Sequence, residues 1–293
     1  MTKVLVTGAS GLLGSSVVQY CADKCEVVGT YLSHPVDFAG VRCLQADLTD
    51  ENQYGPLKQF DPDVIIHCAA LTDVDQCEQE PQKAYNINVD ITRKLVTLAD
   101  SLGARFIHLS TDAVFDGTEG LYTETDEANP INVYGRTKLT AEQVVTEAQA
   151  DSIIVRTNIY GWNATDGQSL AEWMLEKLRD GEELPAFRDA YFSPIYTGTL
   201  ASILFELISR DINGVMHISS PNRYSKLSFA EHLADVFDLN TELIVPTSID
   251  DVDFSAPRGR DLSLSVSRAQ HQLNCDLPTA REGLEQLKRD EYE

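Results

Sequence analysis

The 293-residue sequence lacks the features of several protein classes. It has no apolar run near the ~18 residues that a transmembrane helix needs, so we expect no contact with a membrane. Its six cysteines contain no C-x-x-C pair, and its six histidines are scattered, so we expect no metal site. The first residues enter a strand pattern without the layout of a signal peptide. We therefore expect a cytoplasmic protein with reduced thiols.

Positive charge is also scarce. Lys and Arg total 23 residues, of which nine are Lys, against 46 Asp and Glu, and the formal net charge is −23. Such a chain repels nucleic acid, so no nucleic-acid partner is expected. The acidic excess fits either an ordinary soluble protein or a halophilic cytoplasm. We favour the halophilic interpretation, because at 1 M salt the Debye length falls to roughly 3 Å and self-repulsion costs little.

The first half of the sequence alternates short apolar runs with helical patterns. Strands are predicted at 3–7, 26–31, 43–45, 63–68, 105–110 and 152–156, and the main helices at 12–21, 80–102 and 134–150. Strands that are apolar throughout are typical of parallel sheets covered on both faces. The predicted fold class is therefore α/β, with a doubly wound parallel-sheet Rossmann domain.

The pattern becomes less regular after residue 160. Helices are predicted at 170–178, 199–208, 229–237 and 279–287, with one further strand at 215–219. We expect residues 1–160, together with about 195–220, to form the NAD(P)-binding Rossmann domain. Residues at about 161–194 and 221–293 are expected to form a smaller, mixed C-terminal lobe that binds the substrate.

A glycine-rich segment follows the first predicted strand and opens the first helix. Gly8, Gly11 and Gly14 have the spacing G-x-x-G-x-x-G. Glycines at such a turn let the backbone approach a pyrophosphate, and the helix N-terminus supplies N–H groups. The strand–turn–helix context supports a dinucleotide site. Its predicted residues are Gly8, Ser10, Gly11, Leu12, Leu13 and Gly14.

The second predicted strand lacks the acidic residue that usually binds the adenosine ribose of NAD. The sequence there, from Val28 to His34, contains no Asp, Glu or Arg. This absence favours NADP and leaves NAD possible. Thr30, Ser33 and His34 are the candidates to hydrogen-bond the 2′-phosphate.

Tyr134 and Lys138 lie four residues apart, on one face of a predicted helix. We expect the ammonium of Lys138 to lower the pKa of Tyr134. A tyrosine of this kind exchanges a proton with an alcohol or ketone while a nicotinamide moves hydride. A hydroxyl from Ser110 or Thr111, at the end of a strand, is expected to orient the substrate oxygen.

Together with the glycine loop, segments at 47–48, 67–75, 85–89, 110–117 and 129–139 resemble the extended short-chain dehydrogenase/reductase family. Within that family they are similar to the dTDP-4-dehydrorhamnose reductases. The resemblance implies that Thr111, Tyr134 and Lys138 form the catalytic triad. It places Asp47 and Leu48 beside adenine. It also places Ala69, Ala70 and Thr72 along the cofactor, and makes Asn88 a support of the proton relay.

Two departures from the family pattern bear on the substrate. Asp112 is followed by Ala113 rather than by the Glu of the related dehydratases, which favours simple reduction over elimination. The reductases have an aromatic residue at Ala113, so a roomier pocket is expected. Gly259 replaces a proline in a segment where Arg258 and Arg260 either clamp a nucleotide diphosphate or pair with nearby acidic residues.

Three functions remain open from the sequence. The leading one is NAD(P)H-dependent reduction of the 4-keto group of a nucleotide-activated deoxysugar, with dTDP-4-dehydrorhamnose as the favoured substrate. The second is another nucleotide-sugar reductase or epimerase, because a fold does not fix its function. The third is an NADP-binding regulatory subunit of methionine adenosyltransferase. A homodimer is compatible with all three.

Overall fold

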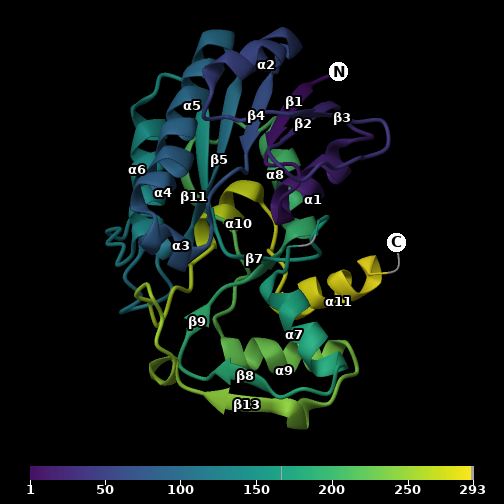
Figure 1. Ribbon diagram of the computed structural model, residues 1–293, viewed down its shortest axis with the longest axis vertical. Coiled ribbons are helices and arrows are strands. Elements are labelled where there is room, and N and C mark those ends of the chain that lie inside the picture. Colours follow the sequence, from purple (N-terminus) through teal and green to yellow (C-terminus); the bar gives the residue numbers. More distant parts are fainter. Residues whose placement is uncertain (166, 292–293) are drawn as a thin grey trace.

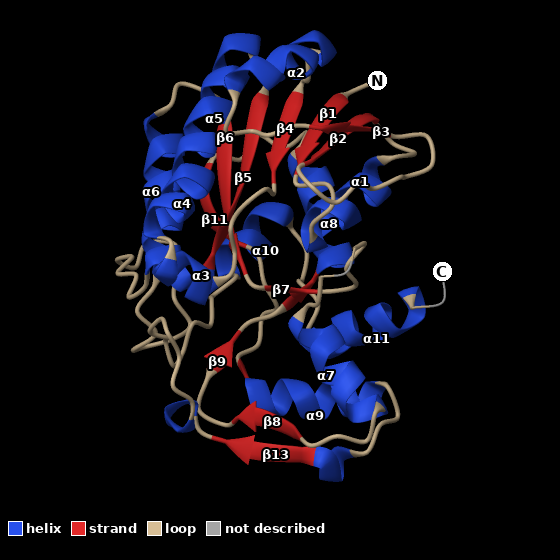
Figure 2. Cartoon of the chain, in the orientation of Figure 1, coloured by secondary structure: helices blue, strands red, loops and turns tan. Residues whose placement is uncertain are grey.

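A seven-stranded parallel sheet forms the centre of the larger part of the molecule (Figures 1 and 2). The computed structural model describes residues 1–165 and 167–291. In spatial order the strands are β11 (Gly214–His217), β6 (Ser152–Thr157), β5 (Arg105–Thr111), β4 (Val64–His67), β1 (Lys3–Thr7), β2 (Glu26–Tyr31) and β3 (Arg42–Gln45). The strand order reverses direction between β1 and β4, which makes this the point where ligands bind in such sheets.

Helices cover both faces of the sheet. Alternate residues of each strand point to opposite faces, so each strand contributes to two apolar cores. Val4 and Val6 pack in the apolar core under α1 (Leu12–Cys21), α8 (Thr197–Leu207) and α10 (Ser267–Leu273). Leu5 packs in the opposite core, with α2 (Gly55–Phe60), α5 (Ile91–Leu102) and α6 (Val133–Glu147). The predicted doubly wound α/β fold is confirmed.

A smaller lobe lies below the sheet in Figure 1 and has its own apolar core. Its helices are α7 (Leu170–Arg179), α9 (Lys226–Val236) and α11 (Ala280–Asp290). Its short strands pair as β8 (Leu184–Phe187) with β13 (Ile244–Thr247) and β9 (Tyr191–Phe192) with β12 (Tyr224–Ser225), and β7 (Ile159–Tyr160) pairs with β10 (Ile195–Tyr196) between the two parts. None of the described helices has the length and apolarity needed to cross a bilayer.

The division of the chain differs from the predicted one at α10. That helix was expected in the C-terminal lobe, but Val266, Ala269 and Leu273 pack in the core under the sheet, with α1 and α8. No local pattern indicates this packing, because one short helix carries too few apolar positions to show which core it joins. Residues 166, 292 and 293 of the predicted lobe lie outside the described part of the chain.

The helix predicted at 80–102 is interrupted. It consists of α4 (Pro81–Tyr85), a π-helical turn at Asn86–Asp90, and α5, and it follows the separate helix α3 (Val74–Gln79). A π turn widens the helix by one residue and often marks a functional position. Asn88 lies in this turn, with its side chain directed toward the loop after β4.

Candidate active site

The turn between β1 and α1 leaves no space for side chains at two of its glycines. Gly8 has φ +71°, a conformation that favours glycine. A Cβ at Gly14 would lie 2.0 Å from the carbonyl oxygen of Gly8. Gly11 precedes α1 and provides no side-chain cap. A helix N-terminus without a side-chain cap presents its first N–H groups to an anion, so the turn fits a pyrophosphate.

The loop after β4 lies beside this turn and is fixed by hydrogen bonds. Thr7 Oγ1 is 2.8 Å from His67 Nδ1, and the Ala69 N–H donates to Thr7 Oγ1 at 3.3 Å. Asn88 Oδ1 accepts from Leu71 N (2.8 Å), and Asn88 Nδ2 donates to Leu71 O (3.1 Å). Asn88 therefore positions the loop that carries Ala69, Ala70 and Thr72, while its expected part in a proton relay stays a prediction.

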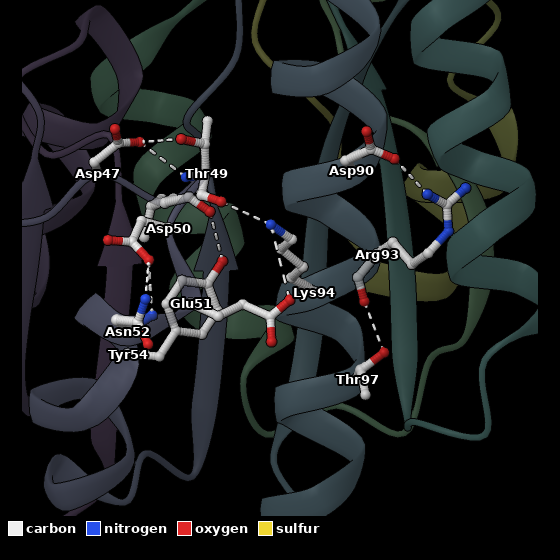
Figure 3. A network of polar contacts seen from close by, with 11 residues as sticks. Asp47, Thr49, Asp50, Glu51, Asn52, Tyr54, Asp90, Arg93, Lys94 and Thr97 are labelled. Carbon is white, nitrogen blue, oxygen red and sulfur yellow. Dashed lines mark hydrogen bonds and ion pairs between the residues drawn. The ribbon is translucent and has the colours of Figure 1, made fainter.

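The segment expected beside adenine is anchored to α5 (Figure 3). Asp47 Oδ1 accepts from the backbone and the hydroxyl of Thr49, at 2.9 and 2.7 Å, which lowers the pKa of Asp47. Lys94, on α5, donates to the Thr49 carbonyl at 2.7 Å. The Tyr54 hydroxyl donates to the Leu48 carbonyl at 2.8 Å. This loop thus has a fixed shape at the end of β3.

The three candidates for the 2′-phosphate differ in exposure. Thr30 is 1% exposed, and its hydroxyl has no hydrogen-bond partner among the described residues. Ser33 and His34 are exposed, and the Ser33 hydroxyl is 3.0 Å from His34 Nδ1. Ser33 and His34 are therefore the ones that a phosphate can reach from solvent.

Thr111 and Tyr134 come together because α6 begins very close to the end of β5. A Cβ at Gly135 would lie 2.1 Å from the Ala113 carbonyl oxygen, so only glycine permits this approach. Asn132 caps α6 by accepting from Gly135 N at 2.8 Å. The hydroxyl of Thr111 thereby lies close enough to the Tyr134 side chain to affect its pKa.

The expected lowering of the Tyr134 pKa by Lys138 is wrong for this arrangement. Burial raises the pKa of Tyr134 and Asp112 raises it further, while the nearby hydroxyl of Thr111 only partly opposes them. Desolvation of the phenolate is thus the larger effect. Burial also lowers the pKa of Lys138, to about 8, and the Lys138 ammonium donates to the Leu109 carbonyl at 2.6 Å.

A buried charged network lies behind Lys138. Glu142, one helical turn further along α6, accepts from Arg156 at 2.9 Å (Nε) and 2.6 Å (Nη2). The Ser110 hydroxyl donates to the same carboxylate at 2.5 Å. Of the two hydroxyls considered for orienting the substrate, Thr111 is therefore the one that faces Tyr134. The charge of Glu142 raises the pKa of Lys138 and so opposes the effect of burial.

One cavity of about 620 Å³ joins the glycine turn to these groups. Its cofactor end is lined by Gly8, Gly11, Leu12, Leu13, Gly14, Cys68, Ala70 and Thr72. Its catalytic end is lined by Ser110, Thr111, Asp112, Tyr134, Lys138, Asn158, Phe192 and Lys226. Among the described residues, the predicted site residues that do not line it are Ser10, Thr30, Ser33, His34, Asp47, Leu48, Ala69, Asn88 and Arg260.

Three polar residues of the catalytic end had no predicted role: Asp112, Asn158 and Lys226. The position of Asp112 directly after Thr111 was a usable signal. Asn158 donates to Asp112 Oδ2 at 2.7 Å and follows β6, where a polar residue at the carboxyl end of a strand offers a weaker signal. Lys226 lies far away in sequence, and no motif marks it.

Of the two arginines proposed to bind a diphosphate, only Arg258 lines the main cavity, although both line a second pocket. Arg258 lines the main cavity, donates to Asp75 Oδ2 at 2.8 Å, and is 24% exposed. Arg260 is 49% exposed and pairs with Asp189 at 3.1 Å and with Asp250 at 2.5 Å. Arg260 thus has the local charge pairing that was the alternative interpretation.

Comparison with known proteins gives consistent results. The sequence profile of the RmlD substrate binding domain matches residues 1–292. The chain is 36% identical to the probable low-salt glycan biosynthesis reductase Agl14 of Haloferax volcanii, over 97% of this chain and 96% of that one. It is 30% identical to methionine adenosyltransferase 2 subunit beta of Danio rerio, over 92% and 84% of the two chains.

The solved structures include a dTDP-4-dehydrorhamnose reductase from Bacillus anthracis in complex with NADP. It superposes with a TM-score of 0.85 at 28% identity and covers 99% of this chain and 100% of that one. The similarity therefore extends through both the sheet domain and the smaller lobe.

Proposed function

The chain belongs to the RmlD substrate binding domain family of extended short-chain dehydrogenases/reductases, and on that premise we propose that it reduces the 4-keto group of a nucleotide-activated deoxysugar with NADPH. It is an RmlD-like NAD(P)-dependent nucleotide-sugar reductase. The proposed substrate is dTDP-4-dehydro-L-rhamnose, and the product is dTDP-L-rhamnose. The observation that carries the proposal is that Thr111, Tyr134 and Lys138 line one end of a cavity that is continuous with the glycine turn.

Two observations support NADP as the cofactor. The similar reductase from Bacillus anthracis is described in complex with NADP. In this chain the end of β2 and the turn after it, residues 28–34, contain no acidic residue that would repel a 2′-phosphate, and Ser33 and His34 are exposed there. Gly8, Gly11 and Gly14 would hold the pyrophosphate, with the N-terminus of α1 directed at it.

The reaction divides between cofactor and chain. Bound NADPH supplies the hydride for the carbonyl carbon. The hydroxyls of Thr111 and Tyr134 bind the carbonyl oxygen, and Tyr134 donates its proton to that oxygen. Burial raises the pKa of Tyr134 and so keeps the hydroxyl protonated at neutral pH. Lys138 supplies positive charge on the same helix face below about pH 8.

Turnover tests the proposal directly. The purified chain is mixed with NADPH and dTDP-4-dehydro-L-rhamnose, and loss of the reduced nicotinamide absorbance is followed in parallel with formation of dTDP-L-rhamnose. NADH is measured in the same way. Stoichiometric oxidation of NADPH is expected only with the keto-sugar present. The proposal fails if neither nucleotide is oxidised with this or another nucleotide-linked 4-keto sugar.

A second candidate function follows from the 30% identity to a methionine adenosyltransferase subunit. In that case the chain would bind NADP and regulate a synthetase without turning over a sugar. Tyr134 and Lys138 do not discriminate between the two functions. A stable complex with a methionine adenosyltransferase on gel filtration, combined with absent turnover, would favour the regulatory function.

A further inference from the structure

Lys226 occupies an unfavourable position for a lysine. It is the first residue of α9, where the helix dipole is positive and a cation is destabilising. Its side chain lines the main cavity, and its ammonium lies 3.2 Å from the centre of the Phe192 ring. Burial lowers the pKa of Lys226. Neither helix stability nor solvation therefore accounts for a lysine at this position.

Asp112 is the acidic group that faces Lys226 from the sheet domain. It is 2% exposed and lies next to Thr111 at the end of β5. Its carboxylate accepts from Asn158 at 2.7 Å and from the Thr111 hydroxyl at 3.1 Å. Burial raises the pKa of Asp112, and the charge of Lys226 opposes that rise.

The two groups interact across the cavity. Each shifts the pKa of the other, yet among the described ion pairs none joins Asp112 to Lys226. Two opposite charges that line one cavity present an acceptor and a donor to whatever lies between them. A sugar hydroxyl, which both donates and accepts, satisfies such a pair. The carbonyl-binding pair Thr111–Tyr134 adjoins this space.

We infer that Lys226 is a substrate-binding residue that donates a hydrogen bond to a ring hydroxyl of the sugar beside the carbonyl held by Thr111 and Tyr134. This inference rests on the proposed function and deepens it. Asp112 binds the same region of the sugar from the opposite wall. The smaller lobe thereby contributes to selecting the sugar, because Lys226 belongs to α9 of that lobe and Asp112 to the sheet domain.

The competing explanation is structural. An ammonium placed over an aromatic ring gains a cation–π interaction, so Lys226 would then serve only to pack β9 against α9. The two explanations differ in what they predict for the sugar. A structural lysine affects stability and all ligands alike, whereas a sugar-binding lysine affects only ligands that carry the sugar.

The experiment compares dTDP-L-rhamnose with dTDP by calorimetry, on the full chain saturated with NADP. Lys226→Met keeps the length of the side chain and removes its charge. Lys226→Arg restores a donor. Lys177→Met is the matched control, because Lys177 is a surface residue of the same lobe that pairs with Glu182 at 2.6 Å. Thermal melts and NADP affinity are measured for every variant.

Loss of a hydrogen bond from a charged group corresponds to a roughly 10- to 100-fold weaker affinity. We expect that loss for dTDP-L-rhamnose with Lys226→Met, less than about twofold change for dTDP, and partial recovery with Lys226→Arg. Equal losses of affinity for both ligands, or no loss for either, would overturn the inference. The proposed function would still stand in that case, because it depends on the affinities of the wild-type chain. If the wild-type chain binds neither ligand, both the inference and the dTDP-sugar assignment are wrong.

Discussion

The two ends of the active-site cavity are constructed differently. At the cofactor end the walls are backbone and small residues, and Gly8 and Gly14 leave no space for a side chain. At the catalytic end they are polar side chains from both parts of the molecule, including the buried Asp112 directly after β5 and Lys226 on α9. The first end thus depends on backbone shape, and the second on the placement of charge and protons.

This difference separates the expected effects of substitutions. A change at the cofactor end acts by steric overlap and should alter nucleotide binding. A change at the catalytic end acts on a proton or a charge and should alter turnover or substrate binding while leaving the nucleotide in place.

The largest expected effect is that of Tyr134→Phe. Loss of the proton donor should reduce kcat by roughly 10²–10⁴-fold. The dissociation constant for NADPH should change by less than about twofold, because the glycine turn is untouched. Stopped-flow turnover and fluorescence titration with NADPH measure the two quantities. Retained turnover would remove Tyr134 from the mechanism.

Gly14→Ala tests the cofactor end. The added Cβ would meet the Gly8 carbonyl oxygen at 2.0 Å, so the turn must shift. Overpacking of this kind costs about 1–3 kcal/mol, which corresponds to roughly 5- to 150-fold weaker NADPH binding. Gly55→Ala is the matched control, since nothing lies within 4 Å of a Cβ there. Equal NADPH affinities for the two variants would show that the turn does not cradle the nucleotide.

The different positions of Arg258 and Arg260 relative to the main cavity give a third test. Arg258→Met should raise the KM for the nucleotide sugar by roughly tenfold, the effect of losing a charged hydrogen bond. Arg260→Met should change it by less than about twofold, because Arg260 pairs with Asp189 and Asp250 outside the main cavity. Steady-state kinetics at saturating NADPH measure both KM values. A larger increase of KM with Arg260→Met than with Arg258→Met would indicate that Arg260 is the diphosphate ligand.

The dependence of kcat/KM on pH tests the charge of Lys138. Lys138 is protonated below its pKa of about 8, so kcat/KM should fall as the pH rises through 8. Glu142→Gln removes a charge that raises this pKa, so the fall should move to lower pH, by about half a unit to one unit. Glu147→Gln, an exposed position on the same helix, should leave the profile unchanged. If the pH profile of a folded Glu142→Gln variant is unshifted, the titration of Lys138 does not cause the fall of kcat/KM at alkaline pH.

Salt gives the smallest expected effect. With a net charge of −23, screening should relieve self-repulsion, so Tm should rise between about 0.1 M and about 2 M KCl, as the Debye length falls from about 10 Å toward 3 Å and below. Ion pairs such as Arg258–Asp75 respond in the opposite sense. Melts in a second salt of equal ionic strength separate screening from salting-out. A flat or falling Tm would contradict the halophilic interpretation.

Local motifs predicted two sets of residues that the structure brings into one cavity, and their roles stay predictions. Gly8–Gly14 and the pair Tyr134–Lys138 each lie within one turn or one helix, so their geometry follows from spacing alone. The direction of the Tyr134 pKa shift was not predictable in this way. It depends on burial and on Asp112, which are properties of the surroundings of the hydroxyl.

The sequence by itself determined the parallel α/β sheet and the glycine turn, and it predicted the proton donor, because each is encoded by periodicity or spacing over a few residues. Only the tertiary structure decided that Lys226 and Asp112 line the same cavity, that Arg258 lines this cavity and Arg260 does not, and that α10 packs under the sheet. The position of Lys226 relative to Asp112 depends on segments that lie 100 or more residues apart in the chain. The difference between Arg258 and Arg260 depends on small differences in the course of a loop. Contacts between distant segments arise from the packing of whole elements, and no local pattern specifies them.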